Sequence, residues 1–347
     1  MQYRPLGRSG INVSALALGT MTFGSQNSES ESHALIDRAV DAGVTLIDTA
    51  EMYPTTPRAL ETTGRTEEFI GSWILNSGRR DDIILASKVT GAGYSLVRDG
   101  APISPDTIRT ALNGSLKRLR TDVIDLYQIH WPNRGSYHFR QSFIYNPSKQ
   151  QREETLNHIG EVLETLDELV RAGKICYVGL SNETCWGVSQ YLDIAARHNQ
   201  VKVVSIQNEY SLLCRLFDLD MAELSHHEDI GLLAYSPLAA GLLSGKYQGD
   251  ARPQGSRRAV NPDLGGRLND HSIAAVDAYL AVARKHGLDP CQMALAFCLS
   301  RPFMAAVIFG ATTMTQLDNA LAAADLELDD DTLVDIEDVH RLYPIPM

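Results

Sequence analysis

The chain has 347 residues, 44% hydrophobic and 21% charged, a composition that argues against intrinsically disordered, collagen-like and coiled-coil proteins. There are 43 acidic and 31 basic residues, and the resulting net charge of -12 argues against a nucleic-acid-binding protein. Residues 1–5 do not resemble the apolar region of a signal peptide, and no run of about eighteen apolar residues is found, so we expect a cytoplasmic protein without a membrane partner.

Cysteine usage argues against both a disulfide framework and a structural metal site. The five cysteines are odd in number and none belongs to a C-x-x-C pair. Free cysteine is among the most frequently buried residue types, so we interpret these thiols as reduced and mostly part of the core. We therefore expect no metal.

Secondary-structure signals alternate regularly along the chain. Ser9-Gly10 separates two short strand-like runs within residues 3–14 and predicts a hairpin. After it, short apolar runs predict strands at 15–18, 45–48, 83–88, 123–130, 175–181, 203–207, 232–235 and 306–309. The amphipathic stretches that follow them predict helices at 31–42, 66–75, 104–119, 156–172, 184–198, 218–228, 272–286 and 314–324.

This alternation predicts a closed barrel. Strands separated by helices form parallel sheets through right-handed crossovers, and eight such units close a barrel. Long segments interrupt the alternation at 131–155, 239–270 and 329–347, and the last of these contains one more amphipathic helix at 333–342. Because no linker or shift in composition separates a second domain, we expect one (β/α)8 TIM-barrel domain over residues 1–347, with long loops at its C-terminal face.

Ionisable residues end three consecutive predicted strands: Asp48, Lys88 and His130, with Tyr53 five residues beyond the first. In parallel barrels the carboxyl ends of the strands carry the active site. We expect Asp48 to orient Lys88, the ammonium of Lys88 to lower the pKa of the Tyr53 phenol, and His130 to donate a hydrogen bond to a substrate oxygen.

Two other interpretations of these residues remain open. Each one alone is most often a solvated strand end, and only their coincidence on one barrel face favours chemistry. A lysine at a barrel strand end is also a potential Schiff-base nucleophile, which would make the chain an aldolase.

The segments 43–53, 64–71, 86–88 and 125–132 resemble the aldo-keto reductase superfamily in order and spacing. The segments 51–54, 128–132 and 310–314 resemble its Tas-like branch. The resemblance implies NADPH-dependent reduction of a small carbonyl substrate, an aldehyde or ketone, to an alcohol. It also implies that Tyr53 is the general acid, supported by Asp48, Lys88 and His130.

Polar residues at the later strand ends are candidates for cofactor contacts, because the chain contains no G-x-G-x-x-G phosphate-binding fingerprint. The resemblance implies that Ser181, Asn182 and Gln207 hold the nicotinamide carboxamide and that Tyr235 stacks under the ring. It further assigns the pyrophosphate to a loop containing Ser236, Pro237, Leu238, Gly241, Lys246 and Arg257. Local positive charge is needed there, and Lys246, Arg252, Arg257 and Arg258 provide it.

A helix predicted after the last strand begins near Gly310, and a helix N-terminus can receive an anion. The resemblance places the adenosine 2′-phosphate of NADP(H) there, with contacts from Thr312, Gln316 and Asn319. Asn319-Ala320 replaces the family's usual Glu-Asn pair, and no arginine occupies 312 or 316, so NAD(H) remains an open alternative.

The substrate pocket is the least defined part of the sequence. Phe23, Met52 and Trp131 are candidates for an apolar lining, and each is equally typical of core packing. The superfamily also contains potassium-channel β subunits, so the alternative function is an NADP(H)-binding redox-sensing regulatory module. No feature of the sequence predicts an oligomeric state.

Overall fold

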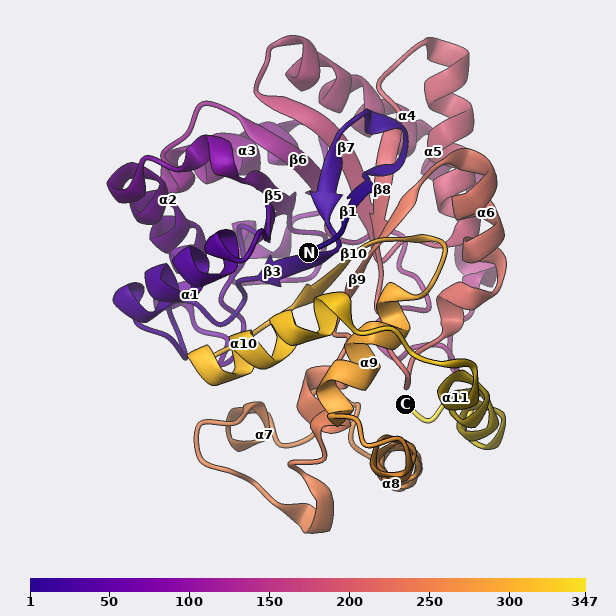
Figure 1. Cartoon of the computed structure of the whole chain (residues 1–347). Coiled ribbons are helices and arrows are strands. Elements are labelled where there is room, and N and C mark those ends of the chain that lie inside the picture. Colours follow the sequence, from indigo (N-terminus) through magenta and orange to yellow (C-terminus); the bar gives the residue numbers. More distant parts are fainter.

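The computed structural model describes residues 1–347 and contains a closed barrel of eight parallel strands, in the order β10-β3-β4-β5-β6-β7-β8-β9 (Figure 1). The strands are β3 (Leu16–Gly19), β4 (Leu46–Asp48), β5 (Ile84–Val89), β6 (Ile124–Ile129), β7 (Ile175–Ser181), β8 (Val203–Gln207), β9 (Gly231–Tyr235) and β10 (Met304–Phe309). The predicted (β/α)8 fold is confirmed, and all eight predicted strands are present within two residues at each end.

The predicted N-terminal hairpin is also present, as strands β1 (Tyr3–Pro5) and β2 (Asn12–Ser14) in antiparallel pairing. Leu6 and Val13 are fully buried against apolar residues of the strand starts, including Ala17 and Leu46. The hairpin therefore closes the N-terminal end of the barrel and leaves the opposite end for the long loops.

Helices surround the barrel (Figure 1). They are α1 (Glu29–Asp41), α2 (Arg65–Ser77), α3 (Pro105–Leu119), α4 (Arg152–Arg171), α5 (Cys185–His198), α6 (Asp220–Glu228), α7 (Arg257–Val260), α8 (Asp270–Lys285), α9 (Pro290–Leu299), α10 (Met314–Leu321) and α11 (Asp330–Leu342). Their starts follow local chemistry: Ser28 and Ser104 form capping boxes that satisfy free backbone N–H groups. None of these helices is long and apolar enough to cross a bilayer.

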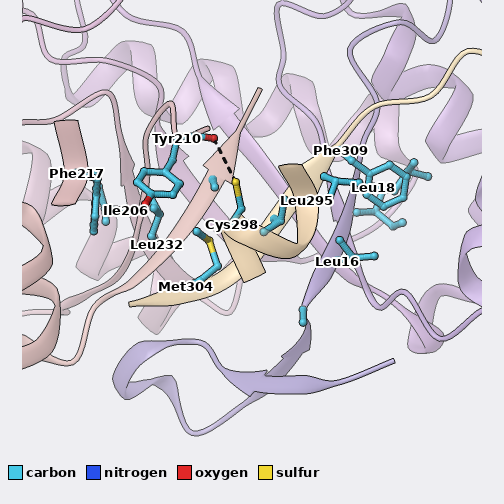
Figure 2. Packing of buried hydrophobic residues seen from close by; sticks show 14 of the residues in the cluster. Leu16, Leu18, Ile206, Tyr210, Phe217, Leu232, Leu295, Cys298, Met304 and Phe309 are labelled. Carbon is cyan, nitrogen blue, oxygen red and sulfur yellow. Dashed lines mark hydrogen bonds between the residues drawn. The ribbon is translucent and has the colours of Figure 1, made fainter. Parts of the chain in front are cut away.

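Helix α9 was not predicted. Seven of its ten residues are buried, so its apolar residues are not confined to one side and the periodic signal of an amphipathic helix is missing. The remaining signal is Asp289, which caps the helix, followed by proline at the first helical position. Figure 2 shows Cys298 and Leu295 of α9 between two groups of core side chains, one around Tyr210 and Met304 and one around Leu18 and Phe309.

A close helix contact gives a test of this packing. Helices α2 and α3 approach at Gly71, where an added Cβ would lie 2.1 Å from the carbonyl oxygen of Arg118. We expect Gly71→Ala to lower the free energy of unfolding by about 1–3 kcal/mol, because backbone atoms must move apart. Gly160→Ala in α4 is the matched control, since nothing lies within 4 Å of its added Cβ. Denaturant unfolding should show no loss for the control, and equal losses would contradict the contact.

Candidate active site

The acid and the lysine form a buried ion pair inside the mouth of the barrel. Asp48 is the last residue of β4 and Lys88 lies near the end of β5, with exposed fractions of 4% and 0%. The Lys88 ammonium lies 2.8 Å from Oδ1 and 2.7 Å from Oδ2 of Asp48, and 2.7 Å from the carbonyl oxygen of Thr49. All three ammonium hydrogens therefore have acceptors below the surface of the site.

The phenol and the imidazole lie beside this pair. The Lys88 ammonium is 5.3 Å from the centre of the Tyr53 ring, and the rings of Tyr53 and His130 are 5.8 Å apart in an edge-to-face arrangement. His130 follows β6 directly, and its Nδ1 is buried without a hydrogen-bond partner. Nε2 is thus the ring nitrogen available to a substrate. The structure brings together all four residues of the predicted set.

Burial sets the protonation of the basic groups. It lowers the pKa of Lys88, an effect that the negative charge of Asp48 opposes. It also holds the pKa of His130 well below its usual value, and the positive charge of Lys88 acts in the same direction. The imidazole is therefore neutral at neutral pH and can donate through only one nitrogen.

The expected effect of Lys88 on Tyr53 is not found. Burial raises the pKa of the Tyr53 phenol, the charge of Asp48 raises it further, and only the positive charge of Arg257 opposes them. The sequence argument expected Asp48 to orient the ammonium, but Asp48 also binds it through both carboxylate oxygens, and its negative charge offsets the positive charge near Tyr53. Tyr53 therefore keeps its proton at neutral pH, as a proton donor must.

The candidate carboxamide-binding residues meet at the ends of β7, β8 and β9. The Ser181 hydroxyl donates to the carbonyl oxygen of Gln207, and Nδ2 of Asn182 donates to the carbonyl oxygen of His130. The Tyr235 hydroxyl donates to Oδ1 of Asn182 over 2.7 Å. Asn182 therefore connects the candidate cofactor residue Tyr235 to the backbone of His130.

The loop after β9 holds the candidate pyrophosphate residues. Ser236, Pro237 and Leu238 follow the strand, and Gly241 has a φ of 93°, a region that favours glycine. The Lys246 side chain lies against Gly241, where an added Cβ would be 2.9 Å from its Cε. Lys246 has no carboxylate partner within 4.0 Å.

The arginines of this loop have different environments. The side-chain hydrogen bonds of Arg257 go only to Sδ of Met21 and the Thr56 hydroxyl, and burial together with the charge of Arg267 lowers its pKa to about 10. Arg258 is instead buried in an ion pair with Asp250, and Arg252 lies 3.7 Å from the same acid. Of the four basic residues expected to supply positive charge, Arg252 and Arg258 are paired with Asp250. Lys246 and Arg257 have no carboxylate partner.

The residues after β10 lie around the start of α10. Gly310 follows the strand, and the Thr312 backbone N–H and hydroxyl both donate to Oε1 of Gln316. Thr313 caps the helix. Asn319 is engaged elsewhere: its Nδ2 donates to Asp289 over 3.3 Å, and its Oδ1 accepts from Gln292 over 2.6 Å.

The three substrate-pocket candidates differ in position. Phe23 is fully buried in the main core, the packing position that the sequence left open as an alternative to the pocket lining. Met52 is 7% exposed and packs with Ala50, and Trp131 and Tyr53 border the same small cluster. Trp131 is fixed by a 3.0 Å hydrogen bond from its indole N–H to the carbonyl oxygen of Ala92.

Sequence reasoning missed two groups of polar residues next to the site. Gln128 is fully buried and donates to Asp48, and its only sequence signal is a polar residue inside an apolar strand. Glu209 accepts ion pairs from Arg267 over 2.7 Å and Arg140 over 3.1 Å, joining both long loops to the end of β8. No sequence pattern pairs residues this far apart. The chain contains no group of His, Cys, Asp and Glu placed to hold a metal ion.

An eight-stranded parallel barrel with a phenol, a lysine, an acid and an imidazole at neighbouring strand ends defines a class of barrel oxidoreductases. The chain belongs to the Aldo/keto reductase family, which it matches over residues 15–341. It is therefore an NAD(P)H-dependent oxidoreductase.

Relatives support this assignment along the whole chain. "Protein tas" from Escherichia coli (strain K12) is 45% identical over 350 residues, covering 100% of this chain and 99% of that protein, which confirms the expected Tas-like branch. "Uncharacterized oxidoreductase YrpG" from Bacillus subtilis (strain 168) is 33% identical, covering 98% and 96%. "Probable voltage-gated potassium channel subunit beta" from Oryza sativa subsp. japonica is 31% identical, covering 94% and 92%.

His138, in the long loop after β6, gives a test of burial near the site. Its ring is buried and lies 3.0 Å from the carbonyl oxygen of Glu183, and burial lowers its pKa to about 4. The unfolded chain, with a histidine pKa of about 6.5, binds more protons between these two values. Stability is therefore full above pH 6.5 and decreases as the pH falls towards 4, by at most about 3 kcal/mol from this group.

We expect His138→Gln to remove most of this acid-dependent loss, because an amide can keep the hydrogen bond without titrating. Urea unfolding at a series of pH values between 4 and 7 measures the slope. His227→Gln, at an exposed histidine of α6, is the matched control and should keep the slope of the unaltered chain. Identical slopes for all three proteins would contradict the burial of His138.

Proposed function

We propose that residues 1–347 form one (β/α)8 domain that reduces aldehydes or ketones to alcohols with NADPH, with Tyr53 as the general acid. The observation that carries the proposal is the state of the four polar residues. The rings of a protonated phenol and a neutral imidazole lie 5.8 Å apart, beside a lysine that is paired with Asp48. These are the groups needed to protonate a developing alkoxide.

The residues would act in sequence on the carbonyl oxygen. Nε2–H of His130 would donate a hydrogen bond to it, orienting the carbonyl carbon towards the nicotinamide. Negative charge develops on the oxygen as the carbon accepts hydride, and Tyr53 transfers its proton there. The ring centre of the phenolate that remains would lie 5.3 Å from the Lys88 ammonium, and the positive charge of Arg257 favours the phenolate. Met52 and Trp131 would line the substrate side.

Lys88 itself is a poor candidate for a Schiff-base nucleophile. Its side chain is fully buried, and all its hydrogens are directed to Asp48 and Thr49. A nucleophilic amine must be deprotonated and open to the substrate. This environment favours the reductase over the aldolase.

The residues of the candidate cofactor side fit a nicotinamide dinucleotide. Lys246 and Arg257 are cations without carboxylate partners, which suits a pyrophosphate, and no group of the chain donates to Oε1 of Gln207, which suits a carboxamide NH₂. Bound NADPH would supply the hydride. Ser181 and Asn182 would hold the carboxamide with Gln207, and Tyr235 would support the ring.

The preference for NADPH over NADH rests on the start of α10. Thr312, Gln316 and the free N–H groups of the first turn would receive a 2′-phosphate next to Gly310. Asn319 has its amide engaged by Asp289 and Gln292, so we assign it an indirect contribution through the position of the helix. NADH is the competing cofactor.

The second candidate function is an NADP(H)-binding regulatory module with weak or no turnover. The rice relative named as a probable potassium channel β subunit matches 94% of this chain, which favours considering it. The assembled proton-transfer set of Asp48, Tyr53, Lys88 and His130 favours the enzyme, because binding alone requires none of its proton chemistry.

Tyr53→Phe tests the reductase directly. We expect the variant to bind NADPH with an unchanged Kd and to lose at least about a hundredfold in kcat, because only the proton donor is removed. The measurements are NADPH fluorescence titration and loss of reduced-nicotinamide absorbance with a panel of aldehydes and ketones, each repeated with NADH.

The matched control is Tyr94→Phe. Tyr94 packs with Met52 in the cluster bordered by Tyr53, and its buried hydroxyl has no hydrogen-bond partner. This variant should keep kcat within about twofold. Full turnover by Tyr53→Phe would contradict the proposed general acid. NADPH binding by the unaltered chain without turnover of any carbonyl would favour the regulatory module.

A further inference from the structure

Two buried glutamines complete the hydrogen bonding of Asp48. Nε2 of Gln207 donates to Oδ1 of Asp48 over 2.8 Å, and Nε2 of Gln128 donates to the same oxygen over 3.3 Å. Nε2 of Gln207 also donates to Oε1 of Gln128 over 3.2 Å. The carboxylate thus receives hydrogen bonds from β5, β6 and β8, and the two amides support each other.

The chemistry of the acceptor fixes the orientation of both amides. An ionised carboxylate only accepts hydrogen bonds, so each glutamine must turn its nitrogen towards Asp48. Gln207 then directs both N–H groups inward, to Asp48 and Gln128, and Oε1 remains free of donors from the chain. Gln207 therefore has a donor end towards the ion pair and an acceptor end towards the candidate carboxamide site.

The fold makes room for this arrangement. Gln128 pairs in register with Lys88 on one side and with Gly179 on the other. An added Cβ at Gly179 would lie 3.0 Å from Cγ of Gln128 and 2.7 Å from Oγ of Ser205. A larger residue at 179 would displace Gln128, so the missing side chain in β7 leaves the space that the amide pair uses.

We propose that Gln128 and Gln207 are positioning residues that form an amide relay between the nicotinamide carboxamide site and the Asp48–Lys88 ion pair. The inference rests on the proposed function, because the outer end of the relay is the cofactor. A hydrogen bond accepted at Oε1 of Gln207 strengthens the donation from its Nε2, since linked hydrogen bonds polarise one another. Gln128 holds the Gln207 amide in the orientation in which its Nε2 donates to Asp48.

The first test measures cofactor binding and needs no turnover. NADPH fluorescence titration gives the Kd of the unaltered chain, Gln128→Met, Gln207→Met and the double variant. We expect Gln207→Met to raise the Kd about tenfold. Gln128→Met should raise it about threefold. The double variant should match Gln207→Met alone, because Gln128 affects the cofactor only through Gln207.

The matched control is Ser205→Ala. Ser205 is fully buried beside Gly179 in the same layer of the barrel, and its hydroxyl has no hydrogen-bond partner. The substitution leaves Asp48 and both glutamines in contact, so the Kd for NADPH and kcat should stay within about twofold of the unaltered chain.

The second test uses pH to separate positioning from packing. The carboxyl group introduced by Gln128→Glu can donate to Asp48 while it is protonated, as the amide does, and it repels Asp48 once it is ionised. We expect the ratio of kcat for Gln128→Glu to kcat for Gln128→Met to fall as the pH rises from about 5 to about 9. The step should lie above the ordinary glutamate pKa of about 4.3, because a buried acid beside a carboxylate resists ionisation.

The outcomes are distinct. Additive effects of Gln128→Met and Gln207→Met on the Kd, or a kcat ratio that is constant with pH, would overturn the relay and leave the reductase intact. The relay would also be overturned if Gln128→Met had the NADPH Kd and the kcat of the unaltered chain. Absence of both NADPH binding and turnover in the unaltered chain would overturn the proposed function and the relay together.

Discussion

The buried ion pair of Lys88 and Asp48 is the interaction on which the rest of the site depends. Removing either charge from water costs several kcal/mol, and the cost is offset only if the partner and all remaining hydrogen bonds are in place. The barrel meets this condition with neighbouring strands that carry the two charges, the Thr49 carbonyl and two amide side chains. Loss of either charged residue leaves the other uncompensated.

The pair also sets the state of its neighbours. Burial keeps His130 neutral and Tyr53 protonated, and the pair adds to both effects, its positive end acting on the pKa of His130 and its negative end on that of Tyr53. Such pairs are weak sources of stability, and an apolar pair of similar volume is often as stable or more so. We therefore attribute the ion pair to proton transfer and not to the stability of the fold.

Much of the fold and of the candidate site was predictable from the sequence. Hydrophobic periodicity indicates strands and helices, and capping and turn residues indicate where they end. The eight strands, the hairpin and the residues at the strand ends followed from local signals. Helix α9 did not, since a helix buried on most sides loses its periodicity. Phe23, the pKa of Tyr53 and the role of Gln128 also needed coordinates, because burial and partner geometry depend on contacts between residues far apart in the chain.

Replacing the pair by apolar residues tests the central claim that the ion pair serves chemistry and not stability. Asp48→Leu alone should lower the free energy of unfolding by about 3–5 kcal/mol, because it leaves a buried ammonium without its partner. The double variant Asp48→Leu with Lys88→Met should regain that stability or exceed it, while carbonyl turnover stays abolished. A double variant as unstable as the single one, or one that keeps turnover, would contradict the account.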